Sequence, residues 1–161
     1  NVAMSPCAKN VFIDVADYRN FTFNDSSTNK LFTNIVSNPP YFIENTTSPD
    51  EKRSLARNSN SLPFEDLLKN SSEMLCEGGR LSIIVPTSVA YLVISSAVKY
   101  DLFLCRRTDI ADSPSSCFKR SLLEFTYDIM LQTERDFLII HEEDGRYSSD
   151  YKRLMCDFLF L

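Results

Sequence analysis

The sequence is poor in glycine and has no excess of positive charge. Only 3 of 161 residues are glycine, at positions 78, 79 and 145. Loops that cradle cofactor phosphates are normally rich in glycine, so the sequence does not supply such a loop. The net charge is −5, with a pI near 4.9. A basic surface spread over the whole protein is therefore excluded, and any RNA contact must come from local patches.

The sequence also lacks the cysteine spacing of a disulfide framework or a zinc site. Its 5 cysteines are scattered, odd in number and form no Cys-x-x-Cys pair. Reduced thiols in a cytoplasmic protein with no metal are the simplest interpretation. No apolar stretch has the length needed to span a membrane. We therefore predict no membrane partner.

The most informative motif is Asn38-Pro39-Pro40-Tyr41, which follows an apolar run over 31–37. Proline fixes φ near −65° and provides a carbonyl without an N–H donor. Asn38 adds a side-chain acceptor, and Tyr41 adds a flat apolar face. The tetrapeptide therefore has the properties of a carboxamide clamp for a planar amino group. The alternative is a turn that ends a strand and carries no chemistry.

The pattern along the chain predicts one α/β domain over 1–161. Apolar runs predict strands at 11–15, 31–37, 80–86, 102–107, 121–127 and 137–141, and helical spacing predicts helices at 62–77, 88–100 and 148–158. Gly78-Gly79 is expected to end the first helix, and Ser88 to cap the second. The polar segment 42–61 is a candidate substrate loop. Late strands in a row indicate an antiparallel edge. Ligands of open α/β sheets bind at the carboxyl ends of strands, where Asp17 and Asn38 lie.

The order of these features resembles class I S-adenosylmethionine-dependent methyltransferases. The closer resemblance is to the tRNA1(Val) adenine-37 N6-methyltransferase family. It rests on Asn1-Val2-Ala3-x-Ser5-Pro6, Arg53-x-x-Ala56-Arg57, Lys119-Arg120-Ser121-Leu122-Leu123-Glu124-Phe125 and Tyr147-Ser148-x-x-Tyr151-x-x-Leu154-x-x-Asp157-Phe158.

The resemblance implies a Rossmann-like sheet with the strand order 3-2-1-4-5-7-6. Segment 11–15 would be its third strand and 31–37 its fourth. The first two strands and the glycine-rich cofactor loop have no counterpart in this sequence. We therefore expect an N-terminally incomplete methyltransferase domain that does not bind the cofactor normally by itself.

The resemblance also implies roles for single residues, with S-adenosyl-L-methionine as cofactor and tRNA as partner. Asp17 would accept a hydrogen bond from the cofactor's adenine, flanked by Ala16 or Tyr18. Asn38, which also lies against the cofactor, and the carbonyl of Pro39 would accept the two hydrogens of the substrate amine. Pro40 and Tyr41 would complete the clamp, and Phe42 would line the base pocket. Arg53 and Arg57 would contact RNA phosphates. A second basic patch is expected at Arg106, Arg107, Lys119 and Arg120.

Two other interpretations remain open from the sequence. The same clamp would serve an enzyme that methylates a glutamine amide of a release factor, because both targets are planar conjugated nitrogens. The chain would otherwise be a non-catalytic RNA-binding fragment. His141, the only histidine, is expected to be an inert strand-end residue, and Tyr147 and Tyr151 are expected to pack the last helix.

Overall fold

The computed structural model describes residues 8–18, 21, 32–39 and 64–158. Its elements, in chain order, are η2 (Ala8–Asn10), β1 (Phe32–Ser37), α2 (Phe64–Met74), β2 (Leu75–Pro86), η5 (Thr87–Val89), α3 (Ala90–Ala97), η6 (Val98–Tyr100), β3 (Phe103–Ala111), β4 (Arg120–Thr126), β5 (Glu134–Ile139) and α4 (Ser149–Met155).

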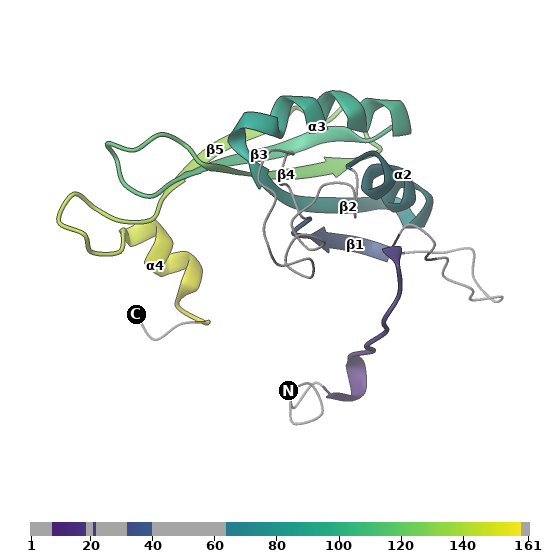
Figure 1. Cartoon of the computed structure of the whole chain (residues 1–161), viewed down its shortest axis with the longest axis horizontal. Coiled ribbons are helices and arrows are strands. Elements are labelled where there is room, and N and C mark those ends of the chain that lie inside the picture. The colour runs from purple at the N-terminus through teal and green to yellow at the C-terminus, as the bar shows by residue number, and fades with distance from the viewer. Residues whose placement is uncertain (1–7, 19–20, 22–31, 40–63, 159–161) are drawn as a thin grey trace, which may run out of the picture.

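The described strands form one five-stranded sheet in the order β1-β2-β4-β3-β5 (Figure 1). β1 is parallel to β2, and β5 is parallel to β3, whereas β4 is antiparallel to both of its neighbours. The first four strands in this order correspond to 4-5-7-6 of the methyltransferase sheet. The α/β class and the Rossmann-like order are thereby confirmed. The antiparallel strand was expected at an edge, and that position is wrong, because β4 lies inside the sheet between β2 and β3.

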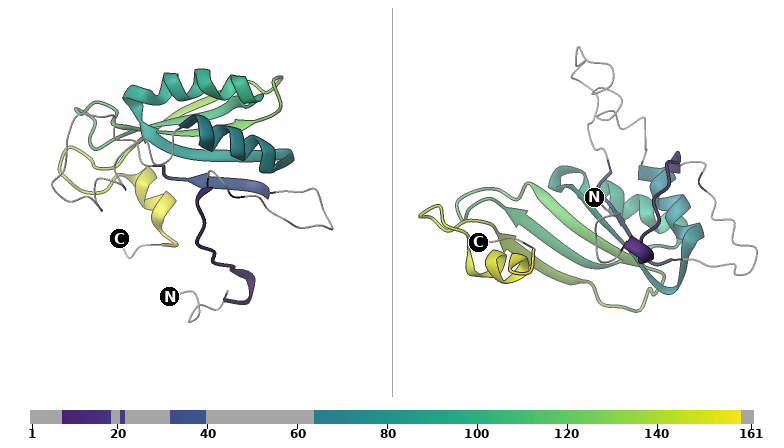
Figure 2. Two further views of the ribbon diagram at one scale, coloured as in Figure 1. Left: turned by 45° about the vertical axis from the view of Figure 1, so that its right-hand side comes forward. Right: turned by 90° about the horizontal axis from the view of Figure 1, so that it is seen from below.

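The helices α2 and α3 cover one face of the sheet, and α4 lies on the opposite side near β5 (Figures 1 and 2). Apolar side chains recur at helical spacing in α2, where Leu67, Leu68 and Ser71 are buried as their spacing predicts. They pack with alternate residues of β2 and β4, because a strand presents every second side chain to the same face. The resulting core consists of Leu67, Leu68, Leu75, Leu81, Ile83, Val85, Val89, Ala90, Val93, Ala97, Leu102, Leu123 and Phe125.

The predicted strand at 11–15 is wrong. The structure gives this segment no regular secondary structure, and Phe12 and Val15 are 94% and 97% exposed. An apolar run becomes a strand only where a neighbour pairs with its backbone. Among the described strands, β1 has a single neighbour, β2, and nothing pairs with 11–15.

The predicted role of Gly78-Gly79 is also wrong. α2 ends at Met74, and β2 begins at Leu75, opposite Phe32. The next pair is Asn34 with Arg80, so the two glycines lie in an irregular start of β2. Gly78 has a φ of +74°, and a Cβ on Gly79 would lie 2.8 Å from the carbonyl oxygen of Cys76. Both positions therefore require glycine for this bulge.

The ends of the later helices differ from the predicted ones. Ser88 lies inside η5 and does not cap α3, whose N-cap residue is Val89, without a side-chain hydrogen bond. α4 ends at Met155, and its cap is Ser148, whose side chain accepts a hydrogen bond from the backbone N–H of Tyr151. The hydroxyl of a serine in extended conformation satisfies one of the free N–H groups of the first turn.

Candidate functional site

Asn38 follows directly on the last residue of β1. Ser37 pairs with Ile83 of the parallel strand β2, so Asn38 lies at the carboxyl end of a parallel pair. Side chains alternate along a strand: Ile35 packs against the core, whereas Val36 is 79% exposed. Asn38 is exposed, and the next residue, Pro39, is completely buried. The buried proline anchors the turn while the carboxamide stays accessible.

A cavity of about 350 Å³ lies beside Asn38 on the sheet. Its two charged lining residues are Arg106 and Glu124, and both are paired with residues outside the lining. Arg106 donates to Glu134 at 3.0 Å, and Glu124 forms a short contact with Arg80. The Glu124 hydrogen bond and charge raise the pKa of Arg80. The remaining lining consists of Val36, Ser37, Asn38, Ser82, Ile83, Ile84, Thr108, Leu122 and Leu123.

Several predicted site residues lie outside the described residues. These are Pro40, Tyr41, Phe42, Arg53 and Arg57, together with the candidate substrate loop 42–61. Their roles stay predictions. Of the tetrapeptide, the structure places Asn38 and Pro39.

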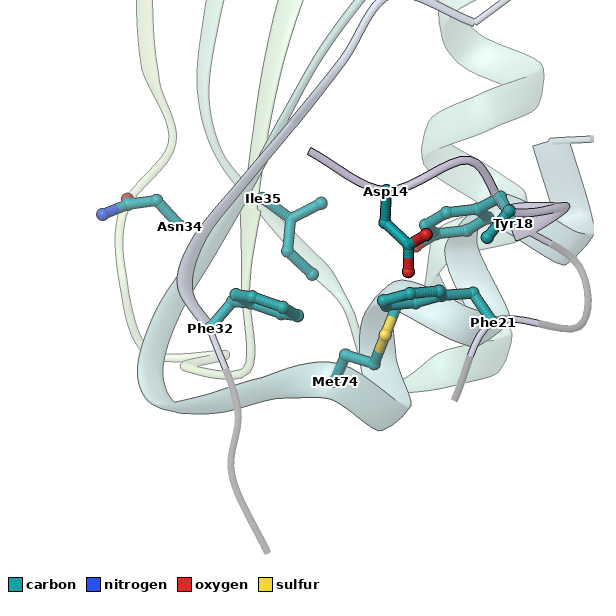
Figure 3. A pocket seen from close by; sticks show the side chains of 8 residues that line it. Asp14, Tyr18, Phe21, Phe32, Asn34, Ile35 and Met74 are labelled. Carbon is teal, nitrogen blue, oxygen red and sulfur yellow. The ribbon is translucent and has the colours of Figure 1, made fainter. Parts of the chain in front are cut away.

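The predicted cofactor residues lie near the other end of β1. Ala16 and Tyr18 line a second cavity of about 350 Å³, together with Asp14, Phe21, Phe32, Asn34, Ile35 and Met74. Figure 3 shows the Asp14 carboxylate among the rings of Tyr18, Phe21 and Phe32. Asp17 is not among the lining residues, although it makes an interaction of its own.

Tyr18 attaches this segment to α2. Its hydroxyl lies 2.8 Å from the hydroxyl of Ser71, and its backbone carbonyl accepts a hydrogen bond of 2.8 Å from the side chain of Asn70. Burial raises the pKa of Tyr18, and the hydrogen bond with Ser71 opposes that shift. Tyr18 also packs against the hydrophobic core, so only part of its side chain lines the cavity.

The chemistry of this second cavity fits an adenine ring, because apolar rings surround a carboxylate that can accept from an exocyclic amine. The carboxylate in the cavity is Asp14, whereas the predicted one was Asp17. Phe32 and Asn38 are six residues apart on an extended strand, or roughly 20 Å. The described residues therefore do not bring the predicted adenine contacts and the carboxamide clamp into one pocket.

The predicted second basic patch is mostly neutralised by neighbouring acids. Arg107 is buried, donates to both carboxylate oxygens of Asp109 at 2.9 and 3.0 Å, and lies over the ring of Tyr91. It is therefore unavailable to phosphates, and that part of the prediction is wrong. Arg106 and Lys119 are paired with Glu134 and Asp112. Within the described part of the chain, Arg120 forms no ion pair.

Sequence reasoning missed two groupings. The first is the partly buried network in which the Ser121 hydroxyl donates to Asp109, the partner of Arg107, and lies 3.2 Å from the hydroxyl of Thr87. The second is a stack of three rings, His141, Tyr147 and Tyr151. The four-residue spacing of the tyrosines was the available signal for the stack, but the position of His141 depends on a hairpin that the pattern did not reveal.

None of the described helices combines the length and the apolar character that a membrane span requires. No group of three or more histidine, cysteine or acidic side chains among them is arranged to hold a metal ion.

Comparison with known proteins identifies the relatives of this chain. No protein-family model matches it. It is 33% identical over 158 residues to tRNA1(Val) (adenine(37)-N6)-methyltransferase of Bacteroides thetaiotaomicron, covering 98% of this chain and 64% of that protein. Proteins of the same name from Porphyromonas gingivalis and Musicola paradisiaca are 34% and 32% identical, covering 96% and 98% of this chain and 62% of each relative. Over nearly its whole length, the chain is therefore similar to proteins of this one name.

The chain spans somewhat less than two thirds of the length of these curated relatives. Among solved structures, it resembles a protein described as a predicted O-methyltransferase from Agrobacterium tumefaciens. The TM-score is 0.60 at 20% identity, covering 86% of this chain and 59% of that one. This likeness supports the class I methyltransferase fold.

Proposed function

We propose that this protein belongs to the family of these relatives and takes part in S-adenosyl-L-methionine-dependent N6-methylation of an adenine in the tRNA anticodon loop, adenine 37. The observation that carries the proposal is the position of Asn38. Its accessible carboxamide follows a parallel strand pair and is held by the completely buried Pro39. Ligands of α/β sheets bind at this edge. The relatives' names supply the substrate.

The chemistry follows from the acceptors at this position. An exocyclic amine of adenine has a lone pair delocalised into the ring. The Asn38 carboxamide oxygen and the Pro39 carbonyl would each accept one of its hydrogens, which favours the tetrahedral, nucleophilic form of the nitrogen. S-adenosyl-L-methionine, when bound, supplies an activated methyl group, so the protein needs no strong general base. Positioning and electrostatics then account for the rate.

The remaining roles extend the proposal to residues whose structure is not described. Tyr41 and Phe42 would stack on and enclose the target base, and Arg53 and Arg57 would contact phosphates. Ala16, Tyr18 and the carboxylate at Asp14 or Asp17 would hold the adenine of the cofactor. The protein would act in the cytoplasm, as its reduced cysteines suggest.

The test compares Asn38→Ala with Thr33→Ala, a control at an exposed polar position of β1 that lines neither cavity. Methyl transfer from labelled S-adenosyl-L-methionine is measured on an unmodified tRNA transcript and on a release factor. We expect Asn38→Ala to lower kcat on tRNA by roughly 100-fold or more, with a smaller change in cofactor affinity. Thr33→Ala should leave kcat unchanged. Unchanged turnover in Asn38→Ala, or transfer to the release factor alone, would contradict the proposal.

A further inference from the structure

Three aromatic rings form a continuous stack beyond the end of β5. The rings of His141 and Tyr147 lie 5.0 Å apart at 24°, and those of Tyr147 and Tyr151 lie 5.1 Å apart at 25°. We call these three residues the aromatic stack. Near-parallel rings at these separations are typical of offset stacking.

Backbone and capping interactions hold the aromatic stack in place. His141 and Tyr147 form an isolated antiparallel bridge, and the backbone N–H of His141 donates to the carbonyl of Asp112 at 2.9 Å. The N–H of Ser148 donates to the carbonyl of Ile140 at 2.9 Å, and its side chain caps α4 by accepting from Tyr151 at 3.1 Å. The rings are thus oriented without a ligand. A preorganised surface loses little conformational entropy on binding.

The aromatic stack is accessible, and both signs of charge lie near it. Tyr147 is 39% exposed, and the other two rings are half-buried. Lys152 follows Tyr151 on α4 and forms no ion pair with another described residue. The adjoining turn carries Glu142, Glu143 and Asp144, of which Asp144 is paired with Arg146 at 3.5 Å. The acidic residues of the turn repel phosphates, so the binding free energy of a nucleotide ligand would come mainly from contact with the aromatic rings.

The aromatic stack lies at the same edge of the sheet as Asn38. β1 and β5 both end at this edge, because β1 is parallel to β2, β4 reverses direction, and β3 and β5 restore it. The strands are four steps apart in the sheet order, which is roughly 19 Å. α4 lies on the side of the sheet opposite α2 and α3 (Figures 1 and 2), and the alternation along β1 puts Asn38 on that side as well. A base held at Asn38 does not reach the aromatic stack.

We propose that the aromatic stack binds an unpaired RNA base other than the one that is methylated. The proposal rests on the proposed function for the presence of single-stranded RNA at this edge. Aromatic side chains bind unpaired bases by stacking, and every base has a face that suits it. The stack would fix the position of the loop while Asn38 holds the target amine.

The test measures the affinity of the protein for a labelled anticodon stem-loop by fluorescence anisotropy. Tyr147→Ala removes the middle ring and so breaks the aromatic stack, which should weaken binding by about 5- to 150-fold, the range for loss of one stacking aromatic. Tyr147→Phe keeps the ring and should bind as the wild type does. Tyr91→Ala removes a tyrosine that is 68% exposed on α3, on the other side of the sheet, and should also bind normally. Thermal unfolding confirms that each variant is folded.

Two further comparisons separate this proposal from the proposed function. A fully paired duplex of the same length should bind wild type and Tyr147→Ala alike, and the salt dependence should be equal, because stacking releases no counterions. If wild type binds and methylates RNA but Tyr147→Ala has unchanged affinity, the aromatic stack is not a base site. If Tyr147→Ala loses affinity while Asn38→Ala keeps full turnover, the proposed function fails alone. If wild type binds no stem-loop RNA, both fail.

Discussion

The hydroxyl of Tyr18 lies 2.8 Å from the hydroxyl of Ser71, and this contact joins the N-terminal segment to α2. Ser71 is completely buried, so it has no water to replace the tyrosine. Because an unsatisfied buried hydroxyl is unfavourable, the pair contributes to stability beyond the packing of the ring.

Tyr18→Phe should lower the free energy of unfolding by about 1 kcal/mol, because it leaves Ser71 unpaired while keeping the ring. The measurement is urea denaturation, read at constant m-value. Ser71→Ala in the Tyr18→Phe background should recover most of the loss, since both polar partners are then absent. Additive losses in the double variant would contradict a direct hydrogen bond.

Stability should fall at alkaline pH. Burial raises the pKa of Tyr18 above its ordinary value of 10.0, and burial likewise raises the pKa of Tyr127. A raised pKa means that the folded state disfavours the phenolate. The stabilisation is fully present below about pH 10 and is lost as pH rises through the raised values. Urea midpoints at pH 8 to 11 measure the decline, and Tyr18→Phe should show a shallower one. Equal slopes in both proteins would exclude Tyr18 as a source.

Asp109→Asn should destabilise the fold by about 3 kcal/mol. The Arg107 side chain is 7% exposed, and its charge would remain buried without a carboxylate. Glu134→Gln is the matched control, because it breaks the exposed ion pair with Arg106 and should cost less than about 1 kcal/mol. The test compares the free energies of unfolding of the two variants, measured by chemical denaturation. Similar losses would mean that burial does not distinguish these pairs.

Cys105 should react with iodoacetamide more slowly than Cys117 and Cys156, by about an order of magnitude or more. It is 5% exposed, and burial, followed by the Glu124 charge, raises the pKa of its thiol. Cys117 and Cys156 are exposed. Peptide mass spectrometry after short labelling at pH 8 gives the rates, and labelling in urea serves as the control because it should equalise them. Equal rates in the native protein would overturn the prediction.

The sequence predicts the parts of the fold that local pattern determines. The buried positions Leu67, Leu68 and Ser71 of α2 follow from helical spacing, and the end of β1 at Ser37 follows from the proline turn after it. Asn34, which is unusual inside a strand, is tolerated because it is exposed on β1.

The errors arise where pairing with a distant segment decides the outcome. Leu75 belongs to β2 because it pairs with Phe32, although its spacing continues the helical pattern of α2. Segment 11–15 has a strand's composition but no paired neighbour among the described residues. An arginine such as Arg107 is typical of an RNA-binding surface. Here its ion pair with Asp109, two residues later on the same strand, holds the side chain in the interior. The position of His141 in the aromatic stack depends on the bridge to Tyr147. None of these contacts produces a periodic pattern in the sequence from which it could be predicted.

The strand that precedes Asn38, β1, is an edge strand of the described sheet. β2 and β4 are each bonded on both sides, whereas β1 is bonded to β2 alone among the described strands. Segments with fewer backbone bonds open locally at a lower free energy than the rest of a domain. Asn38 therefore follows one of the two edge strands of the described sheet, β1 and β5, which open more easily than the strands between them. Because displacements of about 1 Å can change rates 100-fold, whatever lies against the outer edge of β1 would tune turnover without touching the substrate.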